Sequence, residues 1–123
     1  MQISVQAETF SLAQVFTISR GSRTQAQVLT VRVTQNGVVG WGECVPYARY
    51  GETIETVSTQ IKSLGLIKRA DLKAALPAGA ARNAVDCALW DLEAKITGVR
   101  VSDIIGLDPL RPEITAYTLS LDT

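Results

Sequence analysis

The first third of the chain alternates apolar and polar residues with the period of a β-strand. Within residues 26–34, Leu29, Val31 and Val33 alternate with three polar residues, and this period predicts a strand with one buried face. Asn36-Gly37 follows, and this pair favours a tight hairpin because both central residues of such a turn need positive φ. Residues 5–18 are more mixed, and there we expect two short strands around a turn.

The next predicted strand, residues 38–45, carries glycines on one side. Gly40, Gly42 and Cys44 share a face, and larger side chains share the other. Glycines alternating along a strand leave its surface flat, so another element can approach the backbone closely. The first part of the chain is therefore expected to form an antiparallel meander of about three strands.

After Pro46 the apolar period changes to that of a helix. Apolar residues recur at spacings of three and four from Ile54 onward, which predicts a helix over about 53–63 with Thr53 as its N-cap. A short helical stretch is expected around 71–76. The longest helix is expected over 77–97, with Pro77 in its first turn and Gly98 just past its end.

The long helix has one apolar arc rich in small side chains, which favours close packing on the sheet. The arc consists of Ala81, Ala84, Val85, Ala88, Leu89, Leu92 and Ile96. Trp90 falls on the opposite, polar side, and this position predicts a second packing surface. Arg82 and Asp86 are spaced for an ion pair along the helix, as are Asp91 and Lys95.

Near the end of the chain, Ser102-Asp103 predicts the cap of a brief helical turn, and residues 114–121 alternate like a strand. We expect an α+β fold: a three-stranded antiparallel meander followed by a bundle of about three helices. Residues 1–112 would form this unit. The strand near the end of the chain would be the first strand of a unit whose remainder is not in the chain.

The charge and composition of the chain argue against some classes of function. The chain has 123 residues with 12 Lys and Arg, 12 Asp and Glu, and no His. A net charge of zero argues against a nucleic-acid partner and against attraction to an anionic membrane. The N-terminus lacks the pattern of a secretory signal, so we expect a cytoplasmic protein with Cys44 and Cys87 buried and unbridged.

Three blocks of sequence resemble a known family. They are Arg20-Gly21-Ser22-Arg23, the run from Gly42 to Glu52 (GECVPYARYGE), and the run from Pro77 to Leu92 (PAGAARNAVDCALWDL). Together they resemble the N-terminal capping domain of the enolase superfamily, in its mandelate racemase and muconate lactonising group. Within that group the blocks look most like the dipeptide epimerases that act on L-Ala-D/L-Glu.

The resemblance implies an isomerase that inverts the carbon α to a carboxylate. In that family two Lys exchange the α-proton, and Mg²⁺ held by three carboxylates stabilises the enolate. All of these groups lie on the family's TIM-type barrel, of which residues 113–123 would be the truncated first strand, so no catalytic residue and no metal ligand is expected in this chain. The implied partners are a small dipeptide and the catalytic barrel domain of the same enzyme, and the chain alone is expected to be inactive.

The resemblance also implies the substrate-binding residues. The second Arg of the RGSR block, Arg23, would face the carboxylate of the substrate's Glu side chain. Tyr47, Tyr50, Gly51 and Glu52 match the family's second specificity loop.

Each of these assignments has a simpler alternative. Arg23 in a Gly-Ser loop could be a solvated charge, and Arg20 could only brace the loop. Glu43 is expected to be structural, as are Asp86 and Asp91, which diverge around the helix. At the level of the whole chain, two alternatives are the cap of a muconate-type cycloisomerase or other lyase or racemase, and a free-standing binding module without catalysis. Association between copies stays open.

Overall fold

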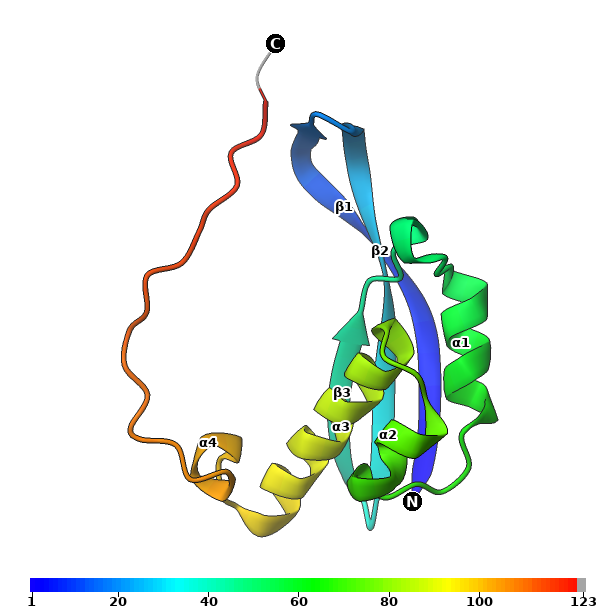
Figure 1. Ribbon diagram of the computed structural model, residues 1–123, viewed down its shortest axis with the longest axis vertical. Coiled ribbons are helices and arrows are strands. Elements are labelled where there is room, and N and C mark those ends of the chain that lie inside the picture. Colours follow the sequence, from blue (N-terminus) through cyan, green and yellow to red (C-terminus); the bar gives the residue numbers. More distant parts are fainter. Residues whose placement is uncertain (122–123) are drawn as a thin grey trace.

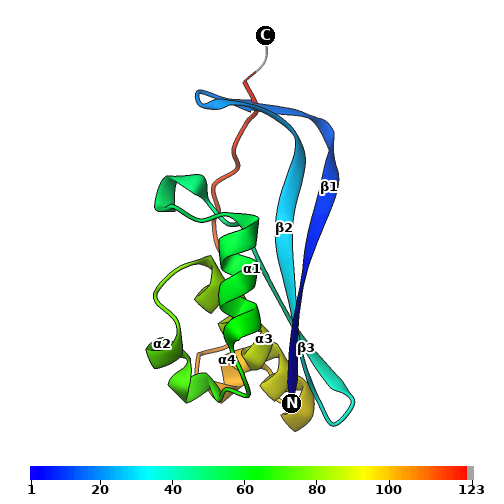
Figure 2. The same cartoon turned by 90° about the vertical axis from the view of Figure 1, so that its right-hand side faces the viewer.

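The computed structural model describes residues 1–121 as a three-stranded sheet with helices on one face (Figures 1 and 2). The strands are β1 (Gln2–Ile18), β2 (Gly21–Gln35) and β3 (Val38–Cys44). They pair antiparallel in the order β1-β2-β3. The α+β fold with an antiparallel meander is thus confirmed.

The turn between β2 and β3 forms at the predicted dipeptide. Asn36 has φ 51° and Gly37 has φ 79°, the pair of positive values that a tight hairpin turn requires. Gln35 and Val38 face each other on either side of the turn. Local turn chemistry therefore sets the register of these two strands.

The expectation of two short strands over residues 5–18 is wrong. This segment belongs to the single strand β1, whose pairing with β2 shifts between Ser11 and Phe16. An irregularity of this kind adds residues to one strand, so the ribbon bends and twists without ending. Figure 2 shows β1 and β2 curving together toward the helical side at their upper end.

The helices follow in the predicted order. They are η1 (Ala48–Tyr50), α1 (Ile54–Ser63), η2 (Arg69–Asp71), α2 (Leu72–Ala75), α3 (Ala80–Thr97) and α4 (Val101–Ile104), where η marks a 3₁₀ turn. Thr53 caps α1 as predicted: its hydroxyl accepts the Thr56 N–H, and the Thr56 hydroxyl accepts the Thr53 N–H. This reciprocal pair satisfies two backbone donors at the start of the helix.

The long helix α3 begins at Ala80, three residues later than expected from Pro77. The Ala80 N–H donates to the Glu52 carboxylate at 2.7 Å, so a distant side chain defines the start of the helix. Its end is as predicted, because Gly98 adopts the left-handed conformation with φ 69°.

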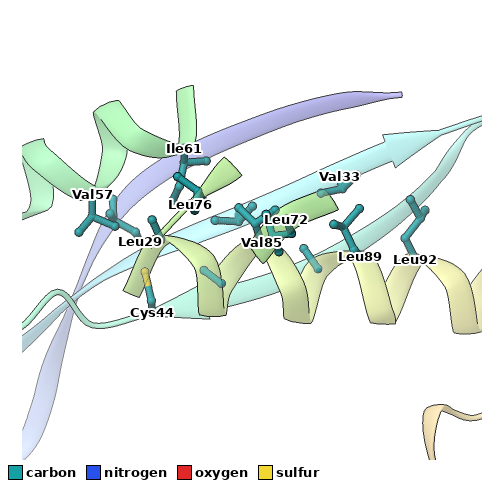
Figure 3. Close-up of a cluster of buried hydrophobic side chains, with 14 residues drawn as sticks. Leu29, Val33, Cys44, Val57, Ile61, Leu72, Leu76, Val85, Leu89 and Leu92 are labelled. Carbon is teal, nitrogen blue, oxygen red and sulfur yellow. The ribbon is translucent and has the colours of Figure 1, made fainter. Parts of the chain in front are cut away.

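The core lies between the sheet and the helices (Figure 3). On the covered face, cross-strand neighbours line up in rows, with Val5 beside Val31 and Val31 beside Gly42. Side chains of α1 and α3, such as Val57 and Val85, point into this face and are almost completely buried.

The glycine face of β3 receives α3, as predicted. A Cβ built on Gly40 would lie 2.1 Å from the carbonyl oxygen of Ala88, and one on Gly42 would lie 2.0 Å from that of Ala84. Nothing larger than hydrogen fits at either position. The Ala-rich arc of α3 is buried with it, except for Ile96, which is 47% exposed and so departs from the expectation.

Side chains of α3 also cover the free edge of β3. Asp91 accepts the Trp41 N–H at 2.8 Å, and the ammonium of Lys95 donates to the Val39 carbonyl at 3.0 Å. The two side chains pair with each other at 2.6 Å. Backbone groups on a sheet edge can otherwise bind another strand. The parallel expectation for Arg82 and Asp86 fails: Arg82 instead donates to the carbonyl of Leu76 at 3.5 Å, and residues 1–121 hold no such ion pair.

Trp90 contacts an arginine, and its predicted second packing surface stays a prediction. The guanidinium of Arg69 lies over its ring, 3.4 Å from the centroid, and also pairs with Glu93 at 3.3 Å. Cys87, on the same side of α3, is exposed, which corrects the expectation that both thiols are buried. Both cysteines are free.

The last part of the chain differs most from the sequence expectation. Helix α4 has no side-chain cap from Ser102 or Asp103; Asp103 pairs instead with Arg100 at 3.1 Å. Residues 107–121 run apart from the helices, along the β3 side of the molecule (Figure 1). No strand forms over 114–121, because a strand needs a neighbour with which to pair. Residues 122 and 123 lie outside the described part.

Candidate functional site

The tip of the β1–β2 hairpin carries Arg23. Beyond the register shift, Phe16 pairs with Arg23, Thr17 with Ser22, and Ile18 with Gly21. Arg23 therefore lies on strand β2 and not in the flexible Gly-Ser loop that the sequence suggested. Its side chain is exposed.

The hairpin tip that carries Arg23 curves toward the side of the sheet that the helices cover (Figure 2). The 47–52 loop lies on that side, and a hydrogen bond from Arg20 to Tyr47 joins it to the tip. The tip and this loop are therefore close in space.

That second loop is a short turn built from the predicted residues. Tyr47 precedes the turn η1, and its carbonyl accepts the Tyr50 N–H at 2.9 Å. The two tyrosine rings lie 5.7 Å apart between centroids at an angle of 49°, a tilted geometry that aromatic pairs favour. Gly51 ends the turn with φ 72°, a left-handed conformation that suits glycine.

Glu52 fastens this loop to the start of α3. One carboxylate oxygen accepts the Tyr47 N–H at 3.2 Å, and the other accepts the Ala80 N–H at 2.7 Å. A carboxylate at the N-terminus of an 18-residue helix also interacts favourably with the helix dipole. Glu52 thereby holds two segments of the chain together.

Arg20 joins the two loops. Its guanidinium nitrogen Nη1 donates to the hydroxyl of Tyr47 at 3.2 Å. The hairpin tip and the 47–52 loop are thus in direct side-chain contact, although 27 residues separate the two partners. This contact agrees with a bracing role for Arg20, and no sequence spacing pointed to Tyr47 as its partner.

A surface hollow of about 660 Å³ lies beside the second loop. It is lined by Glu43, Cys44, Val45, Tyr47, Tyr50, Glu52, Ala78, Gly79, Ala80 and Asn83. Burial raises the pKa of the Cys44 thiol to about 11, with smaller contributions from the charges of Glu52 and Glu43. A thiol with so high a pKa is protonated at neutral pH and is a poor nucleophile.

The structure thus gathers three of the predicted residues, Tyr47, Tyr50 and Glu52, around one hollow. Arg23 lies apart from that hollow, on the hairpin tip that Arg20 ties to Tyr47. Within residues 1–121, no three acidic, thiol or imidazole side chains lie close enough to hold a metal ion. This part of the molecule can bind and position a ligand, and its residues do not fit a Mg²⁺ site.

Comparison with known proteins shows the family. Residues 1–106 match the N-terminal domain of the mandelate racemase / muconate lactonizing enzyme family. The chain belongs to this family.

The chain is 44% identical to the L-Ala-D/L-Glu epimerase of Escherichia coli K12, over 98% of this chain and 39% of the relative. A solved enolase family member from Agrobacterium tumefaciens, described as homologous to dipeptide epimerases and bound to sodium and L-Ala-L-Glu, is 46% identical with a TM-score of 0.90. It matches over 98% of this chain and 38% of its own length.

The dipeptide epimerase of Methylococcus capsulatus, solved with Mg and L-Arg-D-Lys, is 30% identical with a TM-score of 0.73. That match covers 85% of this chain and 34% of the solved one. The chain therefore spans little more than a third of the proteins it matches. Among residues 1–121, no helix is long and apolar enough to cross a membrane.

Proposed function

We propose that this chain is the substrate-specificity cap of a Mg-dependent dipeptide epimerase acting on L-Ala-D/L-Glu. The observation that carries the proposal is the similarity over 98% of the chain to an epimerase of that name and to a structure bound to L-Ala-L-Glu. The geometry supports it, because two loops meet at one end of the sheet with an arginine on one and two tyrosines on the other.

In this proposal the chain's own residues bind and enclose the substrate. Arg23 pairs with the side-chain carboxylate of the dipeptide's Glu, and a guanidinium can bond both oxygens at once. Tyr47 and Tyr50 wall the pocket with aromatic surface and exclude water. Glu52 and Arg20 hold these two loops in place through the contacts described above.

The chemical step belongs to residues outside this chain. Removal of the α-proton needs a base on one face, an acid on the other and a group that stabilises the enolate. Mg²⁺ would supply that stabilisation in the barrel domain. The described residues 1–121 offer the metal no site of their own. Residues 113–123 as the first barrel strand, and the cytoplasm as the compartment, stay predictions.

The test is exchange of the substrate's α-proton in D₂O, followed by NMR. L-Ala-L-Glu with Mg²⁺ should exchange its Glu α-proton and yield the D-epimer when the cap is joined to its barrel. The 123-residue chain alone should show no exchange above the buffer rate. Exchange by the chain alone would contradict the division of roles, and a joined enzyme inactive on every dipeptide would contradict the function.

A further inference from the structure

Ser120 bonds the last described residues of the chain to the tip of the β1–β2 hairpin. Its hydroxyl accepts the Thr17 N–H at 3.0 Å and donates to the carbonyl of Val15 at 3.4 Å. The neighbouring Leu121 N–H donates to the Thr17 carbonyl at 2.8 Å. Three hydrogen bonds thus join segments that lie more than 100 residues apart in sequence.

β1 is an edge strand, so Thr17, although it is paired with Ser22, has backbone groups free on its outer side, and the register shift in β1 frees those of Val15 as well. Residues 12–15 fall between the paired positions Ser11 and Phe16, so they have no partner in β2. Backbone groups left unpaired in this way need other partners. Ser120 supplies one for Val15, and it is the one residue of 107–121 that is not exposed.

Thr17, which Ser120 bonds, is connected to Arg23 through its neighbours in the hairpin. The hydroxyl of Thr17 lies 2.8 Å from that of Ser22, its partner across the hairpin. Ser22 precedes Arg23 in β2, and Arg23 pairs with Phe16, which precedes Thr17 in β1. Fixing the backbone at Thr17 therefore restricts the strand pair that carries the arginine.

We propose that Ser120 is a positioning residue for Arg23: it fixes the hairpin tip against the chain's C-terminal segment. The tip is then held at two points, by Ser120 on one side and by the Arg20–Tyr47 contact on the other. This inference rests on the proposed function only for what Arg23 binds. The hydrogen bonds between Ser120 and the hairpin tip can be tested without an enzyme assay.

Hydrogen exchange of the Thr17 amide, measured on the 123-residue chain, tests the hydrogen bond from Thr17 to Ser120 directly. Ser120→Ala should speed this exchange about 5-fold, the factor that one neutral hydrogen bond typically contributes. Ser120→Thr keeps a hydroxyl and should restore most of the protection. Thr115→Ala is the matched control, because that exposed hydroxyl contacts only its neighbour's carbonyl. Equal exchange in Ser120→Ala and the parent chain would overturn the proposal.

The link to Arg23 is tested in the enzyme with its barrel by a double-mutant cycle. Ser120→Ala should lower kcat/KM for L-Ala-L-Glu by about 3- to 10-fold relative to a dipeptide with an uncharged second residue. In an Arg23→Ala background, Ser120→Ala should have no further effect on this ratio. Additive effects, or equal losses for both dipeptides, would overturn the positioning role.

The hydrogen-exchange experiment and the double-mutant cycle together distinguish failure of the proposed function from failure of this inference. If Arg23→Ala itself leaves the ratio unchanged, the proposed carboxylate recognition fails, and the role of Ser120 in positioning Arg23 fails with it. If the ratio of kcat/KM between the two dipeptides depends on Arg23, but Ser120→Ala leaves hydrogen exchange of the Thr17 amide unchanged, the proposed function stands and this inference is wrong.

Discussion

At the scale of single residues, the cap depends on side chains that bond backbone groups far away in sequence. Glu52 joins the second loop to α3, and Asp91 joins α3 to the edge of β3. Burial raises the pKa of Asp91, but the hydrogen bonds from Lys95 and from the Trp41 N–H, with the charge of Lys95, lower it overall. Apart from the Asp91–Lys95 pair, which spacing along the helix predicted, these contacts do not follow from spacing, because their partners meet only after the sheet and helices pack.

Cys44 gives a prediction for the pH dependence of stability. Its thiol has a pKa of about 11 in the fold against 9.0 when unperturbed, because burial disfavours the thiolate. The folded state thus keeps its proton between about pH 9 and 11, while the unfolded chain loses it. The stability that this group contributes is present below pH 9 and is lost as the pH rises to about 11.

The measurement is urea unfolding at pH 8 and pH 10.5. The loss of unfolding free energy with pH should be on the order of 1–2 kcal/mol greater in the parent chain than in Cys44→Ala. The comparison with Cys44→Ala removes the part due to lysines and tyrosines, which titrate in the same range. Identical pH slopes in the two proteins would show that the thiol is not protected in this way.

At the scale of elements, close packing of α3 on β3 holds the two layers together. Gly40→Ala should destabilise the fold by more than about 3 kcal/mol, because the new Cβ would meet backbone atoms that cannot move independently. Gly65→Ala is the matched control, since nothing lies within 4 Å of a Cβ there. Its unfolding free energy should change by less than about 1 kcal/mol. Thermal or urea unfolding of both variants tests the contrast, and similar effects would contradict close packing as the cause.

The elements also show what the sequence could and could not predict. The Asn36-Gly37 turn, the glycine face and the Thr53 cap were predictable, because each depends on local conformation or on a regular period. The single strand β1 was not, since its apolar residues do not keep one alternation through the irregular stretch between Ser11 and Phe16. The start of α3 at Ala80 depends on Glu52, 28 residues away, so no local signal could place it.

At the scale of the whole molecule, the sheet and helices form two layers, with the hairpin tip and the 47–52 loop at one end. Residues 107–121 run along one side of these layers and form no strand (Figure 1). The candidate site residues came from family resemblance, and the structure brings three of them around a hollow. Their role toward substrate stays a prediction. The partners of Arg20 and Ser120 emerged only from the three-dimensional arrangement, because these contacts join segments distant in sequence.

The most direct test of the account measures kcat/KM of Arg23 variants, in the enzyme with its barrel, on charged and uncharged dipeptides. Loss of one partner of a desolvated ion pair costs about 2–5 kcal/mol, so Arg23→Ala should lose roughly 30-fold to several thousand-fold on L-Ala-L-Glu. Dipeptides with an uncharged second residue should be spared, and Arg23→Lys should recover only part, because an ammonium cannot bond both oxygens in a fork. No change, or an equal loss on both classes of dipeptide, would contradict carboxylate recognition by this cap.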